Sequence, residues 1–144
     1  MNSATPKVLH PLAGIPLIGH VVATAEALEA ESVSVVVRHA AEEVAQAVAD
    51  QSDGVVIVHQ DEVPGTGRAV EVALESLDAS IADVVVLSAD VPLLDSDTVR
   101  AVIGLHRDAG AAVTLLSAIV DDPTGSGRIP RRGAGSVERI LAHG

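Results

Sequence analysis

The chain has 144 residues, 48% of them hydrophobic, and a formal net charge of -11 at pH 7. This length and composition suit one globular domain, and the acidic charge argues against a broad basic surface for nucleic acid. Cysteine is absent, which excludes disulfides, a thiolate metal site and a thiol nucleophile. Acidic residues and glycines interrupt every hydrophobic run, so we expect no signal peptide and no membrane span, and we expect a cytoplasmic protein.

Apolar residues recur with two alternating periods, which is typical of strands joined by crossover helices in a mainly parallel sheet. Phe, Tyr and Trp are absent, so the core must consist of Val, Ile, Leu and Ala. The strand at 84–87 has four consecutive apolar residues and is expected to be buried on both faces. In chain order, the pattern predicts a helix at 17–28, a strand at 33–37, a helix around 44–48, a strand at 55–58, a helix at 70–77, the strand at 84–87, a helix capped by Asp95 or Ser96, a strand at 112–120, and a hairpin of 128–132 with 136–141.

Ligands of open parallel sheets bind outside the carboxyl ends of the strands, and three segments of this chain follow predicted strands. The first contains Gln60 and then Gly65-Thr66-Gly67 at the start of a helix. Small residues there would let backbone N–H groups approach an anionic ligand. Taken alone, however, these residues fit an ordinary strand-to-helix turn better than a ligand loop.

The second segment is Ser88-Ala89-Asp90, where a carboxylate follows the most hydrophobic strand just before Pro92. Asp90 could hold Mg²⁺, a cation that prefers oxygen ligands and bridges carboxylates to phosphates. Capping a turn or accepting backbone hydrogen bonds explains an aspartate at this position equally well.

The third segment, 121–129, could bring the backbone of Gly127 and the guanidinium of Arg128 near a sugar phosphate. On its own it fits a Pro-Gly surface turn better than a site. Lys7 follows a proline near the start of the chain and could either be solvated or be held for phosphate contact.

Taken together, four motifs resemble the sugar-phosphate nucleotidyltransferases, in particular the uridylyltransferase domain of bifunctional N-acetylglucosamine-1-phosphate uridylyltransferase / glucosamine-1-phosphate acetyltransferase. The resemblance covers almost the whole chain. It implies an α/β fold, namely a Rossmann-like three-layer α/β/α nucleotidyltransferase domain with a mainly parallel sheet, in which 1–144 form one partial MobA-like NTP transferase domain with the first strand missing. The motifs are, in order, Pro6-Lys7-Val8-Leu9, Gln60 with Gly65-Thr66-Gly67, the segment 88–94 and the segment 122–129.

The resemblance also implies a reaction between UTP and N-acetylglucosamine 1-phosphate that yields UDP-N-acetylglucosamine for cell-wall synthesis and releases pyrophosphate. Lys7 would contact a phosphate and Asp90 would ligate Mg²⁺. The sugar phosphate is already an anion at neutral pH, so no general base is required. The positions implied to bind substrate are Lys7, Gln60, Gly65 and Thr66 for the nucleotide, Ser88, Ala89 and Asp90 for the nucleotide and sugar pocket, and Gly127 for the N-acetylglucosamine portion.

The chain departs from the family pattern at both ends. Of the Gly-rich loop L-x-A-G-x-G-T-R-M that precedes Pro-Lys-x-Leu in the family, only Met1 could remain. Ala142 stands where the family has a ligand-binding glutamate, and a later metal-binding asparagine would lie beyond Gly144. We therefore expect a truncated and impaired copy whose natural reading frame begins upstream, and whose exposed sheet edges favour poor stability and self-association.

Two alternatives stay open, namely a catalytically inactive nucleotide-binding fragment and a nucleotidyltransferase for another sugar phosphate or cofactor. A receiver-like signalling domain is disfavoured because no acidic cluster follows the first predicted strand.

Overall fold

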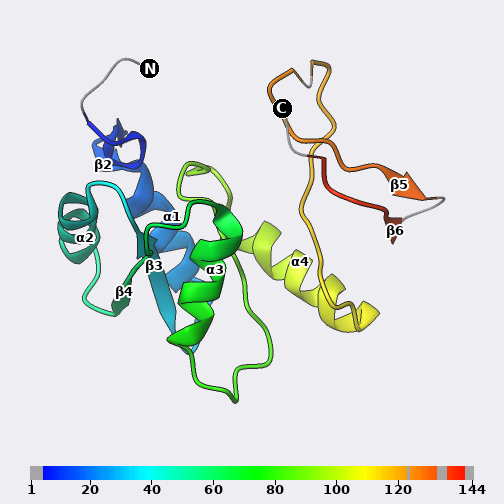
Figure 1. Cartoon of the computed structure of the whole chain (residues 1–144), viewed down its shortest axis with the longest axis horizontal. Helices are drawn as coiled ribbons and strands as arrows, with labels where there is room; N and C mark the ends of the chain where they lie inside the picture. The colour runs from blue at the N-terminus through cyan, green and yellow to red at the C-terminus, as the bar shows by residue number, and fades with distance from the viewer. Residues whose placement is uncertain (1–4, 123, 133–135, 142–144) are drawn as a thin grey trace. The chain divides into compact units, whose positions relative to one another are not determined.

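A computed structural model describes residues 5–122, 124–132 and 136–141 (Figure 1). It contains two compact units, Met1–Ala101 and Val102–Gly144. Within the described residues, no helix has the length and apolarity that crossing a membrane requires.

The first unit begins with a short 3-10 helix, η1 (Lys7–Leu9), and a two-residue antiparallel pair, β1 (Pro11–Leu12) with β2 (Ile15–Pro16). Ala13 and Gly14 connect the pair with φ of 51° and 88°. Positive φ at both central residues is the condition for a tight hairpin turn, and glycine meets it without strain. The hairpin leads directly into α1 (Leu17–Glu26).

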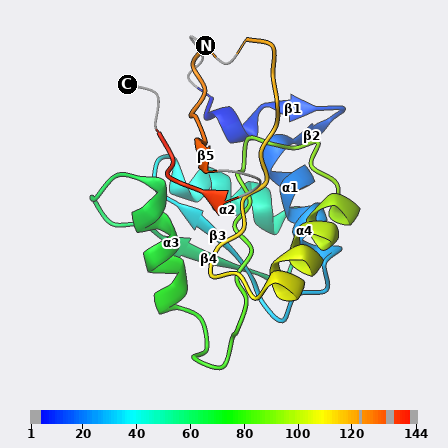
Figure 2. The same ribbon diagram turned by 90° about the vertical axis from the view of Figure 1, so that its right-hand side faces the viewer.

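The main sheet of this unit is a parallel pair, β3 (Val33–Val37) with β4 (Val55–His59), in register from Val33↔Val55 to Val37↔His59. Parallel strands need a crossover, and α2 (Ala41–Ala49) provides it. The chain leaves β4 through a loop and continues into α3 (Thr66–Glu75). Figure 2 shows α3 and α1 on opposite sides of the strand pair.

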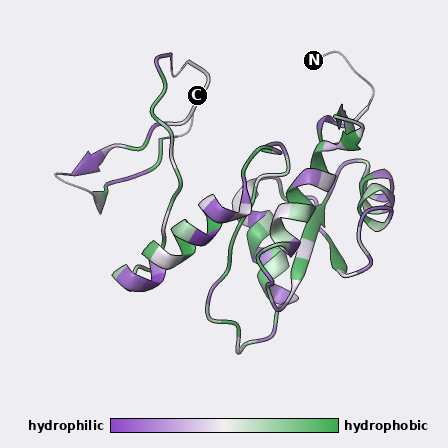
Figure 3. Ribbon diagram, turned by 180° about the vertical axis from the view of Figure 1, so that it is seen from behind, coloured by the Kyte–Doolittle hydropathy of each residue, from purple (hydrophilic) through white to green (hydrophobic). Residues whose placement is uncertain are grey.

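The core of this unit is entirely aliphatic. Its most buried members are Val48, Ile18 and Val22, with 1%, 3% and 3% of their surface exposed. Residues of η1, both strands and Ala89 pack against these three side chains. The β3 and β4 ribbons are correspondingly hydrophobic in Figure 3. The core therefore holds together the segments that carry Lys7 and Asp90.

The helix α4 (Ser96–Ala109) crosses from the first unit into the second. Asp95 caps it, as the sequence predicts, because its carboxylate accepts hydrogen bonds from the Thr98 backbone N–H and hydroxyl, both at 2.8 Å. The second unit also contains β5 (Arg131–Arg132) paired antiparallel with β6 (Ser136–Val137), and Arg128 bridges Leu141. The predicted hairpin is thereby confirmed.

Two predicted strands are wrong. Residues 82–88 and 113–120 have no regular secondary structure, and Val84, Val85 and Val86 are 47%, 43% and 57% exposed rather than buried on both faces. A strand needs a neighbour to pair its N–H and C=O groups, and neither segment has one among the described residues. The expected mainly parallel sheet is thus limited to β3 and β4, and the fold class that the structure supports is α/β.

Candidate functional site

Lys7 and Asp90 are separated by 83 residues in the sequence and meet in the structure, with Lys7 Nζ at 2.6 Å from Asp90 Oδ2. Both side chains remain accessible to solvent, with 63% and 42% exposed. Their neighbours are anchored on the same core, because Val8 and Ala89 both pack against it. The core thus fixes the two backbones that bring an ammonium group to a carboxylate.

The hydrogen bond from Lys7 lowers the pKa of the Asp90 carboxyl, and the lysine charge acts in the same direction. Asp90 is therefore ionised at neutral pH. Its backbone lies in a tight turn, in which the Val91 N–H donates to the Ser88 carbonyl at 3.1 Å. This turn presents the charged carboxylate at the surface.

Asp90 fits a magnesium site that substrate would complete. In the part of the chain that the structure describes, no three His, Asp or Glu side chains gather as a ligand set. Mg²⁺ at nucleotide sites is commonly held by one or two carboxylates together with waters and substrate phosphates. An ionised, accessible carboxylate beside a lysine is compatible with that kind of site.

Gln60, Gly65 and Thr66 come together where β4 passes into α3. The Gln60 backbone N–H donates to the Val37 carbonyl at 2.9 Å and so extends the parallel ladder. The Gln60 side chain donates from Nε2 to the carbonyls of Val63 and Gly65, at 2.8 and 3.2 Å. Gly65 has φ of 119° and ψ of 151°, a conformation that side chains disfavour, and Thr66 is the first residue of α3. The glycine is thus required by the backbone itself, whatever the loop binds.

Three charged residues around this loop were not singled out by the sequence motifs. Arg68 on α3 binds Asp61 Oδ2 through Nε at 3.0 Å and Nη2 at 2.8 Å, and Arg38 after β3 donates from Nη2 to the Glu62 carbonyl at 2.9 Å. The bond from Arg68 lowers the pKa of Asp61, and the same pairing raises the pKa of Arg68 further above its usual range. Opposite charges seven positions apart across a turn were the only sequence signal of this pairing.

Gly127 lies in the second unit, beside the bridge between Arg128 and Leu141. A Cβ atom at Gly127 would lie 3.2 Å from the Leu141 carbonyl oxygen. Close backbone approach within the hairpin thus accounts for a glycine at this position. Met1 and Ala142, which the sequence comparison singled out, lie outside the described residues.

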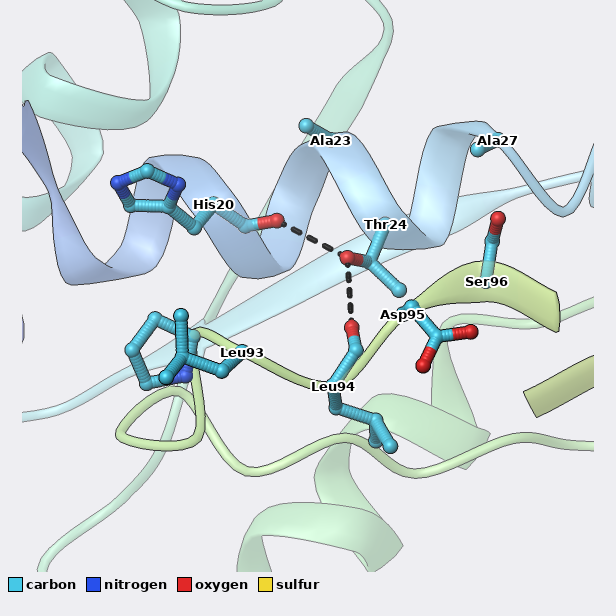
Figure 4. Close-up of a pocket in the computed structure, with 9 residues that line it drawn as sticks. His20, Ala23, Thr24, Ala27, Leu93, Leu94, Asp95 and Ser96 are labelled. Atoms are coloured by element: carbon cyan, nitrogen blue, oxygen red, sulfur yellow. Dashed lines mark hydrogen bonds between the residues drawn. The ribbon is translucent and has the colours of Figure 1, made fainter. Parts of the chain in front are cut away.

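An open groove of about 380 Å³ follows Asp90 in the chain, between α1 and the start of α4 (Figure 4). Across it, Thr24 Oγ1 donates to the Leu94 carbonyl at 3.0 Å and lies 3.2 Å from the His20 carbonyl. This contact ties the segment after Asp90 to α1. None of the residues predicted to bind substrate lines the groove, whose walls are His20, Ala23, Thr24, Ala27, Pro92, Leu93, Leu94, Asp95 and Ser96.

The model of the MobA-like NTP transferase domain family matches residues 1–131. The chain belongs to this family. The match contains Lys7, Asp90 and the loop after β4, and it runs from the first unit into the second. The α/β fold described above agrees with an NTP transferase domain.

The chain aligns with curated relatives at high identity over nearly its whole length. The chain is 54% identical over 142 residues to "Bifunctional protein GlmU" of Clavibacter sepedonicus, an alignment covering 98% of the chain and 29% of the relative. It is 52% identical over 144 residues to the protein of the same name from Leifsonia xyli subsp. xyli, covering 99% and 30%. The chain therefore spans less than a third of the length of these relatives.

Proposed function

We propose that this chain acts in the transfer of a uridylyl group from UTP to N-acetylglucosamine 1-phosphate, which yields UDP-N-acetylglucosamine and pyrophosphate. The observation that carries the proposal is the contact of Lys7 with Asp90 at 2.6 Å, because it joins the two motif residues to which phosphate and metal binding are assigned. Family membership and the similarity to proteins named GlmU support it.

In this mechanism the chain binds and orients charged groups and moves no proton. Lys7 supplies a compact positive charge for a phosphate, and Asp90 would hold Mg²⁺ together with the phosphates of the nucleotide. The chemistry that such a metal ion would supply is neutralisation of the charge that develops on the triphosphate. The acceptor is an anion already, so correct placement of the two substrates accounts for the catalysis expected of these residues.

The loop after β4 would recognise the base. Because the carbonyls of Val63 and Gly65 can only accept hydrogen bonds, the Gln60 nitrogen must face them, which leaves Oε1 to accept from a ligand. The N3–H of uracil is a donor, whereas N3 of cytosine is an acceptor. Placed opposite N3 of the base, the Gln60 Oε1 would favour UTP over CTP, with Gly65 and Thr66 close to the nucleotide.

The remaining proposals concern the sugar and the architecture. Ser88 and Ala89 would line the nucleotide and sugar pocket with backbone atoms, and Gly127 would donate its backbone N–H to the N-acetylglucosamine portion. We extend the proposal to one partial domain over residues 1–144 with a Rossmann-like three-layer α/β/α arrangement. Self-association through exposed sheet edges stays a prediction.

Calorimetric titration of UTP with MgCl₂ into the 144-residue chain tests the proposal, with Asp90→Ala and the control Asp53→Asn. Asp53 is an exposed carboxylate in the turn before β4. Loss of the charge-assisted contacts at Asp90 is expected to weaken UTP binding about tenfold or more, with no change for Asp53→Asn.

Pyrophosphate release in the presence of N-acetylglucosamine 1-phosphate then separates an active enzyme from an inactive nucleotide-binding fragment. Absence of UTP binding by the unaltered chain, or equal binding by Asp90→Ala, would contradict the proposed site.

A further inference from the structure

The 60–65 loop is tied to two neighbouring elements by charged side chains. Arg38, one residue beyond β3, holds the Glu62 carbonyl at 2.9 Å. Arg68, in the first turn of α3, donates hydrogen bonds to Asp61 Oδ2 from Nε at 3.0 Å and from Nη2 at 2.8 Å. The loop is thus fixed from the strand on one side and from the helix on the other.

The two carboxylate oxygens of Asp61 have separate tasks. Oδ1 accepts from the Val63 backbone N–H at 3.1 Å and shapes the turn, while Oδ2 binds Arg68. Val63 in turn accepts the Gln60 side-chain amide through its carbonyl at 2.8 Å. A continuous chain of hydrogen bonds therefore runs from Arg68 through Asp61 and Val63 to the carboxamide of Gln60.

Arg68 is poorly suited to bind a phosphate itself. Besides Asp61, it contacts Glu71 at 3.2 Å and Glu75 at 3.5 Å, so three carboxylates surround one guanidinium. Its side chain is only 27% exposed, compared with 63% for Lys7. The surrounding negative charge would repel a triphosphate. Two nitrogens of the guanidinium already donate hydrogen bonds to Asp61 in the loop.

We infer that Asp61 and Arg68, assisted by Arg38, are positioning residues that hold the Gln60 carboxamide in the orientation that recognises uracil. This inference rests on the proposed function, and it adds a specificity device within the same site. A loop held in its bound conformation before the ligand arrives avoids the entropy loss of ordering it on binding. The consequence lies in nucleotide affinity and selectivity, while the chemical step is unaffected.

Asp61→Asn is the sharpest test, because asparagine keeps an oxygen for the Val63 N–H and turns an NH₂ group toward Arg68. The turn survives and the ion pair is lost. We expect UTP binding to weaken about threefold to fivefold, as loss of an accessible charge pair allows. Discrimination between UTP and CTP should fall as well, and KM for UTP should rise with kcat unchanged if turnover is observed.

Glu75→Gln is the matched control, because Glu75 also contacts Arg68 but, among the described residues, forms no hydrogen bond with the loop. It should leave UTP binding and the UTP/CTP ratio unchanged. Arg68→Gln should weaken UTP binding as much as Asp61→Asn does. The double variant should bind UTP no more weakly than either single variant, because both substitutions remove the same contact. Circular dichroism melting of each variant shows whether the fold is retained.

The outcomes separate this inference from the proposed function. Unchanged UTP binding and selectivity in Asp61→Asn, with weakened binding in Asp90→Ala, would overturn the positioning role alone. The inference would also be overturned if Arg68→Gln bound UTP much more weakly than Asp61→Asn and the two losses of affinity added up in the double variant. Arg68 would then contact the nucleotide directly. Failure of the unaltered chain to bind UTP would overturn both.

Discussion

Lys7 and Asp90 form an ion pair whose two side chains are both more than one-third exposed. Solvent screening limits such a pair to about 0–1 kcal/mol of stability. The two residues nevertheless come from segments 83 positions apart that the same aliphatic core holds in place. The pair itself therefore adds little to the stability of the fold, and the role that we propose for it is in ligand binding.

Replacing Lys7 by Met should therefore change the free energy of unfolding little, and should change the pKa of Asp90 more. Because Lys7 lowers the pKa of Asp90, the ionised pair stabilises the folded chain above the usual aspartate pKa, and this contribution disappears as pH falls through the lowered value. We expect a difference in free energy of unfolding of at most about 1 kcal/mol at pH 7 and none in acid. NMR titration of the Asp90 carboxyl should show its pKa rising in Lys7→Met; an unchanged pKa would contradict the pairing.

The family resemblance, rather than any single motif, assigned roles to Lys7 and Asp90, and the contact between them is consistent with those roles. It did not predict the ties to the 60–65 loop. Arg38 reaches Glu62 only because β3 and β4 run parallel in a register that ends at Val37↔His59. That proximity depends on strand pairing, which no local pattern of residues encodes.

At the scale of elements, helices were predicted well and strands less well. An amphipathic helix satisfies its own backbone hydrogen bonds, so α1 to α4 fall where the periodicity and the Asp95 cap place them. A strand relies on a neighbour, so four consecutive apolar residues at 84–87 were not enough. Figure 3 shows hydrophilic and hydrophobic residues alternating along α4, the pattern behind its prediction.

Gly104→Ala should stabilise α4. Gly104 is exposed within the helix, and apart from its chain neighbours and the nearby backbone of the helix itself, no described atom lies within 4 Å of the Cβ that alanine would add. Removing the backbone freedom of glycine in a helix is worth about 0.5–1 kcal/mol, which should raise the midpoint of thermal unfolding by a few degrees.

Gly19→Ala in α1 is the comparison for this prediction, because its Cβ would lie 2.8 Å from Ile15 Cγ2 and 3.3 Å from Gln51 Cγ. This close contact should cancel the stabilisation that replacing a helical glycine by alanine would otherwise give. Equal stabilisation by both substitutions would show that packing around α1 is looser than the structure indicates. Circular dichroism is the suitable probe, because the chain has no Trp or Tyr for fluorescence.

At the scale of the whole molecule, a small aliphatic core supports the site. Only eight hydrophobic side chains count as buried among the described residues, and none is aromatic. Large rings would otherwise contribute much of the buried area. Each buried valine or isoleucine therefore carries a considerable share of a total stability that is typically about 5–15 kcal/mol.

Val48→Ala should accordingly be costly. Val48 is 1% exposed at the centre of the core cluster, and removing two methyl groups there should lower the free energy of unfolding by about 2 kcal/mol. Val56→Ala on β4, where the side chain is 50% exposed, should cost less than about 0.5 kcal/mol. Urea unfolding followed by circular dichroism measures both, and similar losses would contradict the assignment of the core.

The long separation between Lys7 and Asp90 has a kinetic consequence. The pairing of β3 with β4 closes a short stretch of chain around α2, whereas the Lys7–Asp90 contact closes a loop of 83 residues. Longer closures have a larger entropic cost, and they are made only when other contacts have already drawn the segments together. The contact between Lys7 and Asp90 is thus expected to form late in folding, after the helices and the parallel strands.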